Sequence, residues 1–379
     1  MAGKRKLAEK APQSNGLVLS TESFKALVGK AFKGVGNNKL LPLTQLMCIQ
    51  VKDGTLTLIT SDSTGTNYLY VKQSGIEGEF YATVMAEQFA KLIGKLTCDK
   101  LTLEVEDGKL KVLGNGNYTI ALQYDEMGNA IQYPDPVAEL GDAIEDTQTV
   151  TSATVYKILN SIKPSLALTM EAPYLTGYYA GDVVTATNGE EMGIYDIKML
   201  NTPALLSPVC LELLALSDAE SINIDRYDNG VIVFSTPDVT VYSNEMEGIE
   251  DYPVDALKEF FETDMPADCK LPKNELLQAL DRIALFVGTY DDNAVKLEFT
   301  GKALQISSLA MTGVETVSYI SGKQEVFECN MDLQSLIKHI KTQSTDTVEI
   351  QFGDEQAVKL VDGDVVQIMS LFENSQEDE

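Results

Sequence analysis

The chain has 379 residues, 44% of them apolar, which is enough for two or three domains with buried cores. Its formal net charge of −28 ordinarily argues against binding to nucleic acid. No run of about 18 apolar residues is present, and residues 1–16 are basic without the apolar segment of a secretory signal. We expect a globular protein with no membrane partner and a basic disordered tail over residues 1–16.

The cysteines and the single histidine form no recognisable ligand set. His339 has no second histidine to complete a zinc site, and no C-x-x-C pair occurs. The five cysteines are Cys48, Cys98, Cys210, Cys269 and Cys329. Because they lie far apart, we expect reduced thiols in a cytoplasmic protein that holds no metal and needs no cofactor.

Two similar phrases, FKALVGKA and FAKLIGKL, indicate helices over residues 21–33 and 86–96. Each follows a short apolar strand and precedes sequence that alternates as β-strands do. Asp53-Gly54 and Asp107-Gly108 lie inside those alternating runs, where such pairs favour tight hairpins. A unit of strand, helix and three antiparallel strands is therefore predicted twice.

The same pattern recurs with weaker likeness in the rest of the chain. Helices are predicted over residues 151–164, 207–217, 273–286 and 331–343, each followed by strand-like sequence. Acidic runs containing a Tyr-Pro step separate the pairs of units and favour extended chain. The predicted divisions are domain 1 over 17–125, a linker over 126–148, domain 2 over 149–255, a linker over 256–269, domain 3 over 270–373 and an acidic tail over 374–379.

Basic residues concentrate in the predicted helices. The six helix windows contain eleven basic and six acidic residues, so the rest of the chain carries −33. Lysines on a single amphipathic helix are ordinarily just its solvated face. Their segregation against an acidic background instead favours a positive inner surface in a negative body.

Sequence signals for catalysis are weak. There is no G-x-x-x-x-G-K-[ST] and no G-x-S-x-G, and no histidine other than His339 could activate a nucleophile. Acidic pairs such as Asp53 with Asp62, or Asp291 with Asp292, are better explained as turn residues. We expect no catalytic residues.

Residues 17–372 resemble the bacterial β sliding clamp, the processivity subunit of DNA polymerase III. The resemblance lies in LLPLTQLMCIQVKDGTLTLITSDST, YLTGYYAGDVVTATNGEEMGIYDI and the closing DVVQIMSLF. It implies an α+β fold of three similar domains, each a duplicated strand-helix-three-strand unit, and a homodimer that closes into a ring. It further implies a non-catalytic protein of DNA replication that encircles double-stranded DNA regardless of sequence. Its partners would be the replicative DNA polymerase and a clamp loader.

The resemblance also implies roles for particular residues. In such a ring the helices face the DNA, and phosphate contacts need no base-reading element. The DNA-facing residues would be Lys25, Lys30, Lys33, Lys39, Lys91, Lys95, Lys157, Lys163, Arg282, Lys338 and Lys341. The dimer contact would join Tyr118 of one chain to Phe286 and Val287 of the other, although each of these could instead be buried within its own domain.

A groove for partner peptides is implied between the second and third domains. Its residues would be Leu175, Thr187, Gly189, Met192, Ile368, Met369 and Leu371. From the pattern alone, Leu175 and Met192 could equally be ordinary core. At the rim, Glu190 and Glu191 replace a basic pair of the family, which should change the selection of partner peptides and fits a phage or mobile-element clamp.

The alternative from another class is a β-rich phage virion or carbohydrate-binding protein without a DNA role. Repeated hairpins and high acidity suit that class. It gives no reason for lysines to concentrate on helices, however, and this chain has no tryptophan of the kind that carbohydrate sites usually expose.

Overall fold

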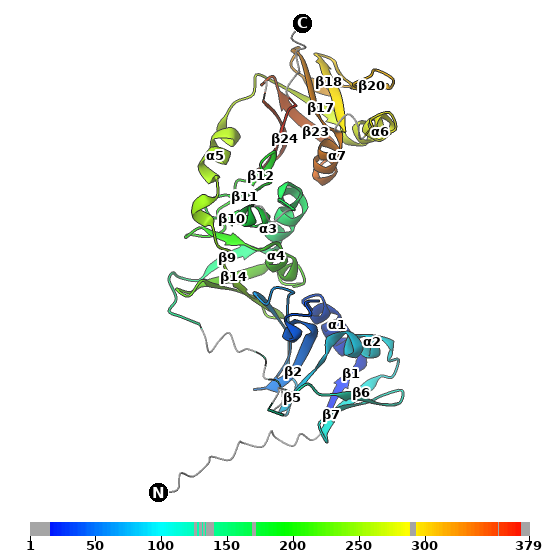
Figure 1. Cartoon of the computed structure of the whole chain (residues 1–379), viewed down its shortest axis with the longest axis vertical. Coiled ribbons are helices and arrows are strands. Elements are labelled where there is room, and N and C mark those ends of the chain that lie inside the picture. Colours follow the sequence, from blue (N-terminus) through cyan, green and yellow to red (C-terminus); the bar gives the residue numbers. More distant parts are fainter. Residues whose placement is uncertain are drawn as a thin grey trace. The chain divides into compact units, whose positions relative to one another are not determined.

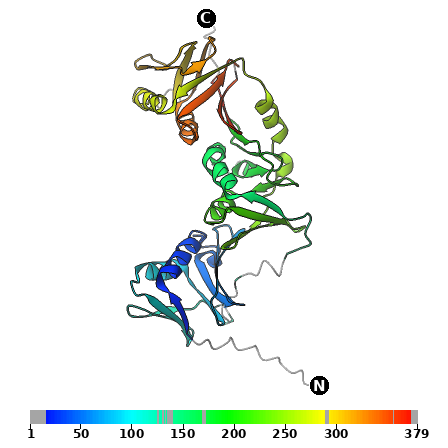
Figure 2. The same ribbon diagram turned by 180° about the vertical axis from the view of Figure 1, so that it is seen from behind.

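The structure is a computed structural model that describes residues 16–124, 127–128, 131, 133, 140–168, 172–288, 293–354 and 356–372. The chain divides into two compact units, Met1–Ser152 with Val209–Asn244, and Ala153–Pro208 with Glu245–Glu379 (Figures 1 and 2). Most of the predicted tail over 1–16, the whole predicted tail over 374–379, part of the predicted 126–148 linker and the Asp291-Asp292 pair lie outside the described residues.

The first unit contains two antiparallel sheets. Their orders are β1-β6-β7-β8 and β5-β2-β3-β4-β16-β15-β14-β9. The elements are β1 (Leu17–Ser20), α1 (Thr21–Phe32), β2 (Leu46–Lys52), β3 (Thr55–Ser61), β4 (Asn67–Ser74), β5 (Phe80–Met85), α2 (Ala86–Lys95), β6 (Lys100–Glu106), β7 (Lys109–Leu113), β8 (Asn117–Ala121), β9 (Gln148–Thr151), most of α4 (Pro208–Leu214), β14 (Ser221–Arg226), β15 (Val231–Ser235) and β16 (Val239–Asn244).

The second unit also contains two antiparallel sheets. Their orders are β13-β10-β11-β12-β25-β24-β23-β17-β21 and β20-β19-β18-β22. The elements are most of α3 (Ser152–Lys157), β10 (Tyr178–Ala180), β11 (Val184–Thr187), β12 (Glu191–Tyr195), β13 (Ala204–Leu206), α5 (Val254–Glu262), β17 (Ala267–Pro272), α6 (Lys273–Ile283), β18 (Ala294–Thr300), β19 (Ala303–Ser308), β20 (Val314–Ser318), β21 (Ser321–Gly322), β22 (Val326–Asp332), α7 (Leu333–Thr342), β23 (Thr347–Phe352), β24 (Ala357–Asp362) and β25 (Val365–Ser370).

The element order repeats the predicted unit of strand, helix and three strands six times, with β1, β5, β9, β13, β17 and β22 as the leading strands. The repeats are paired by strand exchange. β1 pairs with β6 while β5 pairs with β2, and the same exchange joins β9 to β14, β13 to β10, β17 to β23 and β22 to β18. Each pair of repeats is therefore one duplicated structure, as the sequence predicted. The residue boundaries of the three domains stay a prediction.

Helix positions follow from apolar spacing. Buried residues recur every three or four positions, as in Phe24, Val28 and Ala31 of α1 and Phe89 and Ile93 of α2. The two helices pack side by side, and the Phe24 and Phe89 rings meet edge to face with centroids 6.0 Å apart (Figure 1). Because the apolar faces of α1 and α2 are packed, the lysines of both phrases lie on the outer faces of these helices. Both predicted Asp-Gly turns have positive φ at each residue, as tight hairpins require.

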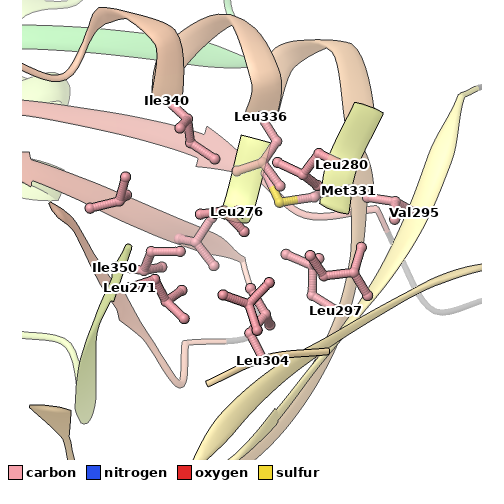
Figure 3. Packing of buried hydrophobic residues seen from close by; sticks show 14 of the residues in the cluster. Leu271, Leu276, Leu280, Val295, Leu297, Leu304, Met331, Leu336, Ile340 and Ile350 are labelled. Atoms are coloured by element: carbon pink, nitrogen blue, oxygen red, sulfur yellow. The ribbon is translucent and has the colours of Figure 1, made fainter. Parts of the chain in front are cut away.

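A large core cluster joins α6 and α7 to the strands beneath them. Figure 3 shows Leu276 and Leu280 of α6 facing Leu336 and Ile340 of α7, with strand residues such as Leu297 below. These side chains are essentially fully buried. Removing apolar surface from water at about 25 cal/mol per Å² is the main stabilising contribution of such a cluster.

One segment differs from the prediction. Residues 256–269 were expected to be an extended linker, but α5 spans Val254–Glu262 and β17 begins at Ala267. Val254, Leu257 and Phe261 recur at helical spacing, and they pack one face of this helix against other apolar residues of the second unit. The Tyr-Pro step only marks the start, because proline is tolerated immediately before a helix. Across the described residues, none of the helices is long and apolar enough to cross a membrane.

Candidate functional site

The lysine on the last turn of α1 is neutralised within its own unit. Lys30 Nζ lies 2.5 Å from Asp218 Oδ2 and 3.1 Å from Asp238 Oδ2. The other oxygen of Asp238 accepts hydrogen bonds from Ser217 (2.6 Å) and Thr236 (3.0 Å). Burial alone would lower the pKa of Lys30, but the two carboxylates outweigh it and raise that pKa. The charge of Lys30 is therefore compensated by carboxylates of its own unit.

The other predicted DNA-facing residues divide by their contacts. Four of the predicted residues are exposed and have no ion-pair partner within the part of the chain that the structure describes: Lys33, Lys39, Lys95 and Lys341. Four others already have a partner. Lys25 donates to the Leu96 carbonyl, and Lys91 pairs with Glu87 at 2.5 Å. Lys157 lies 4.8 Å above the Tyr195 ring, and Arg282 binds both oxygens of Glu315 at 2.6 and 2.9 Å. Lys163 is exposed on a 3-10 turn. Free lysines thus remain just after α1 and on α2 in the first unit, and on α7 in the second.

Glu191 is enclosed by three donors from α7. Its Oε2 atom lies 2.6 Å from Lys338 Nζ and 2.9 Å from His339 Nε2, while Oε1 accepts a hydrogen bond from Ser335 Oγ. The sequence interpretation placed this carboxylate on the groove rim as free negative charge. That interpretation is wrong for Glu191, because both oxygens are occupied and only 12% of its side chain is exposed. Glu190, by contrast, is exposed.

Ionised Glu191 stabilises the folded protein through these contacts. Burial would raise the Glu191 pKa, but the hydrogen bonds from His339, Lys338 and Ser335 outweigh it and lower the pKa to about 2. Burial lowers the pKa of His339 despite the nearby carboxylate, so the ring is neutral at pH 7. Glu191 is therefore ionised in the folded protein at pH values where the unfolded chain already binds a proton.

Replacing Glu191 by glutamine should cost on the order of 2 kcal/mol of unfolding free energy at pH 7. A depressed carboxylate pKa stabilises above the unfolded value of 4.5, and this stabilisation is lost as pH falls from about 4.5 towards 2. The difference between the parent chain and Glu191→Gln should therefore shrink between pH 6 and pH 3 in urea titrations. Glu190→Gln is the control and should change stability little at either pH. A constant difference across that range would contradict the assignment.

The turn that carries this pair is rigidly held. Gly189 adopts φ +97°, which an L side chain rarely adopts. Thr187 Oγ1 accepts from Gly189 N and donates to the Glu191 carbonyl, at 3.0 and 2.7 Å. Asn188 Oδ1 accepts from the backbone N–H groups of Glu190 and Glu191. The rim of the adjacent pocket is therefore preorganised.

A pocket of about 140 Å³ opens beside this turn. Of the predicted groove residues, it is lined by Thr187, Gly189, Met192 and Ile368. Met192 and Ile368 are register partners on β12 and β25, which places them on one face of the sheet. The further lining residues are Glu190, Glu191, Leu257, Phe260, Gln356, Ala357 and Ser370. The pocket has an apolar floor and a polar rim.

Three predicted groove residues lie elsewhere. Leu175 packs against the apolar cluster beneath the pocket without lining it. Met369 is 1% exposed in the core cluster that joins α6 and α7 to the strands, and Leu371 packs against the same cluster. Neighbouring strand residues face opposite sides, so Ile368 faces the pocket while Met369 faces that core. Truncating Met369 would open a core cavity, with a cost of about 2–5 kcal/mol.

Two of the three predicted dimer residues, Tyr118 and Phe286, lie on or beside sheet edges. β8 is the outer strand of its four-stranded sheet, and its Tyr118 is 37% exposed. β20 is the outer strand of the other four-stranded sheet. Phe286 is 51% exposed and packs against the start of β20, since a Cβ added at Gly313 would lie 2.7 Å from its ring. Val287 is half-buried against the core cluster.

Leu257 and Phe260 were missed by the sequence reasoning because their segment was interpreted as a linker. Their spacing of three, with Phe261 following, is the pattern of an amphipathic helix and was the available signal. No three His, Cys, Asp or Glu side chains are grouped as a metal site would need, among the residues that the structure describes. The absence of a metal stays a prediction.

Comparison with known proteins decides the fold. No family model and no curated protein matches the chain. Among solved structures, the DNA polymerase beta subunit of Streptococcus pyogenes is similar with a TM-score of 0.81 at 18% identity, over 94% of this chain and 100% of that one. The Bacillus subtilis DNA polymerase sliding clamp gives 0.81 at 16% identity, over 96% and 100%. The Thermotoga maritima DNA polymerase III beta subunit gives 0.77 at 16%, over 94% and 99%.

The chain has the sliding-clamp fold. The predicted fold class is therefore confirmed: an α+β clamp fold of three similar domains, each a duplicated unit. The candidate sites within the two units are the lysine-bearing helices, the β8 edge, the β20 edge and the pocket beside α5. The alternative of a β-rich virion or carbohydrate-binding protein is not supported.

Proposed function

We propose that this chain is a DNA sliding clamp, a processivity factor of DNA replication that encircles duplex DNA without reading its sequence. The single observation that carries the proposal is the likeness to polymerase beta subunits, which spans 94% of this chain and the whole of the Streptococcus pyogenes structure. The exposed lysines of the packed helices support it, because phosphate contacts from lysine hold position without specifying bases.

A ring would form from two copies joined head to tail. Support comes from two unpaired sheet edges, β8 and β20, each with an exposed aromatic side chain, Tyr118 or Phe286, on or beside it. An open edge strand presents unpaired backbone groups that another strand can satisfy. Pairing β8 of one chain with β20 of its partner would bury both rings and close the ring by two identical contacts.

The pocket beside α5 would receive short apolar motifs of partner proteins, namely the replicative DNA polymerase and a clamp loader. Its size and apolar floor suit one or two side chains that anchor a peptide. In this function the chain itself is not an enzyme and acts in the cytoplasm, and catalysis belongs to the bound polymerase.

Retention on DNA of different topology tests the proposal. The labelled protein, loaded onto nicked circular DNA by a clamp loader, should stay bound through gel filtration. It should be lost once the same DNA is linearised by a restriction enzyme, because a ring slides off free ends. Equal retention on circular and linear DNA would indicate ordinary electrostatic binding, and no retention on either would remove the proposed function.

A further inference from the structure

Phe260 forms a ridge between the pocket and a second hollow. It lies one helical turn after Leu257 on α5, and 45% of its surface is exposed while Leu257 is buried. The second hollow, of about 310 Å³, is lined by Glu259, Phe260, Thr263, Met265, Asp354, Gln356 and Ala357. Phe260, Gln356 and Ala357 belong to both linings, so the two hollows adjoin at these residues.

The far end of α5 is fixed in place. Lys359 of β24 is 3% exposed, and its Nζ donates to the Phe261 carbonyl at 3.1 Å and to the Thr263 carbonyl. These carbonyls are among the last of the helix and would otherwise lack donors. Burial lowers the pKa of Lys359, and the two carbonyls provide its hydrogen-bond partners. Phe260 is therefore held on an anchored backbone.

The near end is anchored equally. The Tyr252 hydroxyl donates to the Thr185 carbonyl at 3.1 Å, and its ring stacks on Tyr179 with centroids 5.5 Å apart. Lys258 of α5 pairs with Asp182 at 2.7 Å. An exposed aromatic side chain on a preorganised helix loses little entropy on binding, which is typical of residues that anchor a partner.

The charge of the second hollow is negative. Glu259 is exposed and Asp354 is half-exposed at its lining. No lysine or arginine lines either hollow within the described ranges. Lys258 pairs with Asp182, and Lys359 donates to backbone carbonyls while its charge also interacts with Asp354. A partner reaching this hollow would find the exposed Glu259 carboxylate and the partly exposed Asp354 beside the Phe260 ring.

We propose that the partner peptide places apolar side chains in the pocket, crosses Phe260 and sets lysine or arginine against Glu259 and Asp354. The inference rests on the proposed function, because it names the chemistry of the peptide that the clamp would bind. It also moves the charge selection from Glu191, which Ser335, Lys338 and His339 occupy, to Glu259 and Asp354.

Fluorescence polarisation with matched peptides tests this. The labelled peptides share one core, two leucines and a phenylalanine spaced by serines. Each peptide is extended at one end only, the N-terminal or the C-terminal, by two lysines or by two glutamines. One lysine extension should bind about five- to tenfold more tightly than its glutamine match at low salt, as expected for two exposed ion pairs. The preference should shrink as salt screens the charges.

Variants locate the effect. Glu259→Gln with Asp354→Asn should abolish the preference and leave the glutamine peptide unchanged, whereas Glu262→Gln, a matched carboxylate on α5 outside both hollows, should preserve it. Ile368→Ala should weaken both peptides. Equal affinities of the two peptides, with both still weakened by Ile368→Ala, would overturn the inference and leave the groove intact. Absence of binding by either peptide would overturn the groove as well.

Discussion

Reversing Lys33, Lys95 and Lys341 to glutamate should prevent loading onto circular DNA, and with it retention, while leaving the fold nearly unchanged. These side chains are exposed and have no ion-pair partner within the described residues, so each reversal should change stability by less than about 0.5 kcal/mol. Each lost phosphate contact weakens the binding of DNA during loading and reduces the salt dependence of that binding. We expect at least a tenfold loss of retained protein, roughly the effect of a few such contacts.

A second triple variant controls for charge alone. Reversing Lys52, Lys109 and Lys302, which are exposed at hairpins rather than on helices, makes the same change in net charge. That variant should be retained like the parent chain. Equal loss in both variants would mean that net charge, and not the helix surface, governs binding. Persistent retention of the helix variant at ordinary salt would show that these helices do not face DNA.

The choice of lysines depends on their contacts. Lys30 and Lys338 are as basic as Lys33 in sequence, but they pair with Asp218 and Asp238 or with Glu191. A glutamate in either place would stand beside partly buried carboxylates. Such a variant would lose stability as well as DNA contact, because removing one partner leaves the other charge uncompensated.

Tyr118→Glu should convert the protein from dimer to monomer. The proposed contact would bury this ring against Phe286 of the partner, and burying a carboxylate there without a partner costs several kcal/mol. Light scattering at micromolar concentration should report about twice 41.4 kDa for the parent chain and 41.4 kDa for the variant. DNA retention should be lost together with the dimer.

Thr119→Glu is the matched control on the same strand. Thr119 lies opposite Lys111 across β7 and β8, on the other face from Tyr118, so a charge is tolerated there. It should remain dimeric. A parent chain that is monomeric at all concentrations, or a dimer unaffected by both Tyr118→Glu and Phe286→Glu, would contradict the proposed contact.

The sequence alone determined the repeated unit. The apolar spacing of FKALVGKA and FAKLIGKL, with Asp-Gly turns between alternating strands, requires an amphipathic helix beside antiparallel strands, because only those elements bury such patterns. Hence six units could be predicted, together with the exposure of Lys33 and Lys95. Local pattern also carried the signal for α5, which the sequence reasoning did not use.

Tertiary structure decided what each polar side chain contacts. Glu191 and Glu190 are adjacent and chemically identical in sequence, yet one is enclosed by α7 and the other is exposed. Ile368 and Met369 are adjacent apolar residues of β25 that face a pocket and a core. Ion pairs join residues far apart in the chain, as Lys30 with Asp218 does, and pockets form where separate elements meet, so no local pattern encodes them.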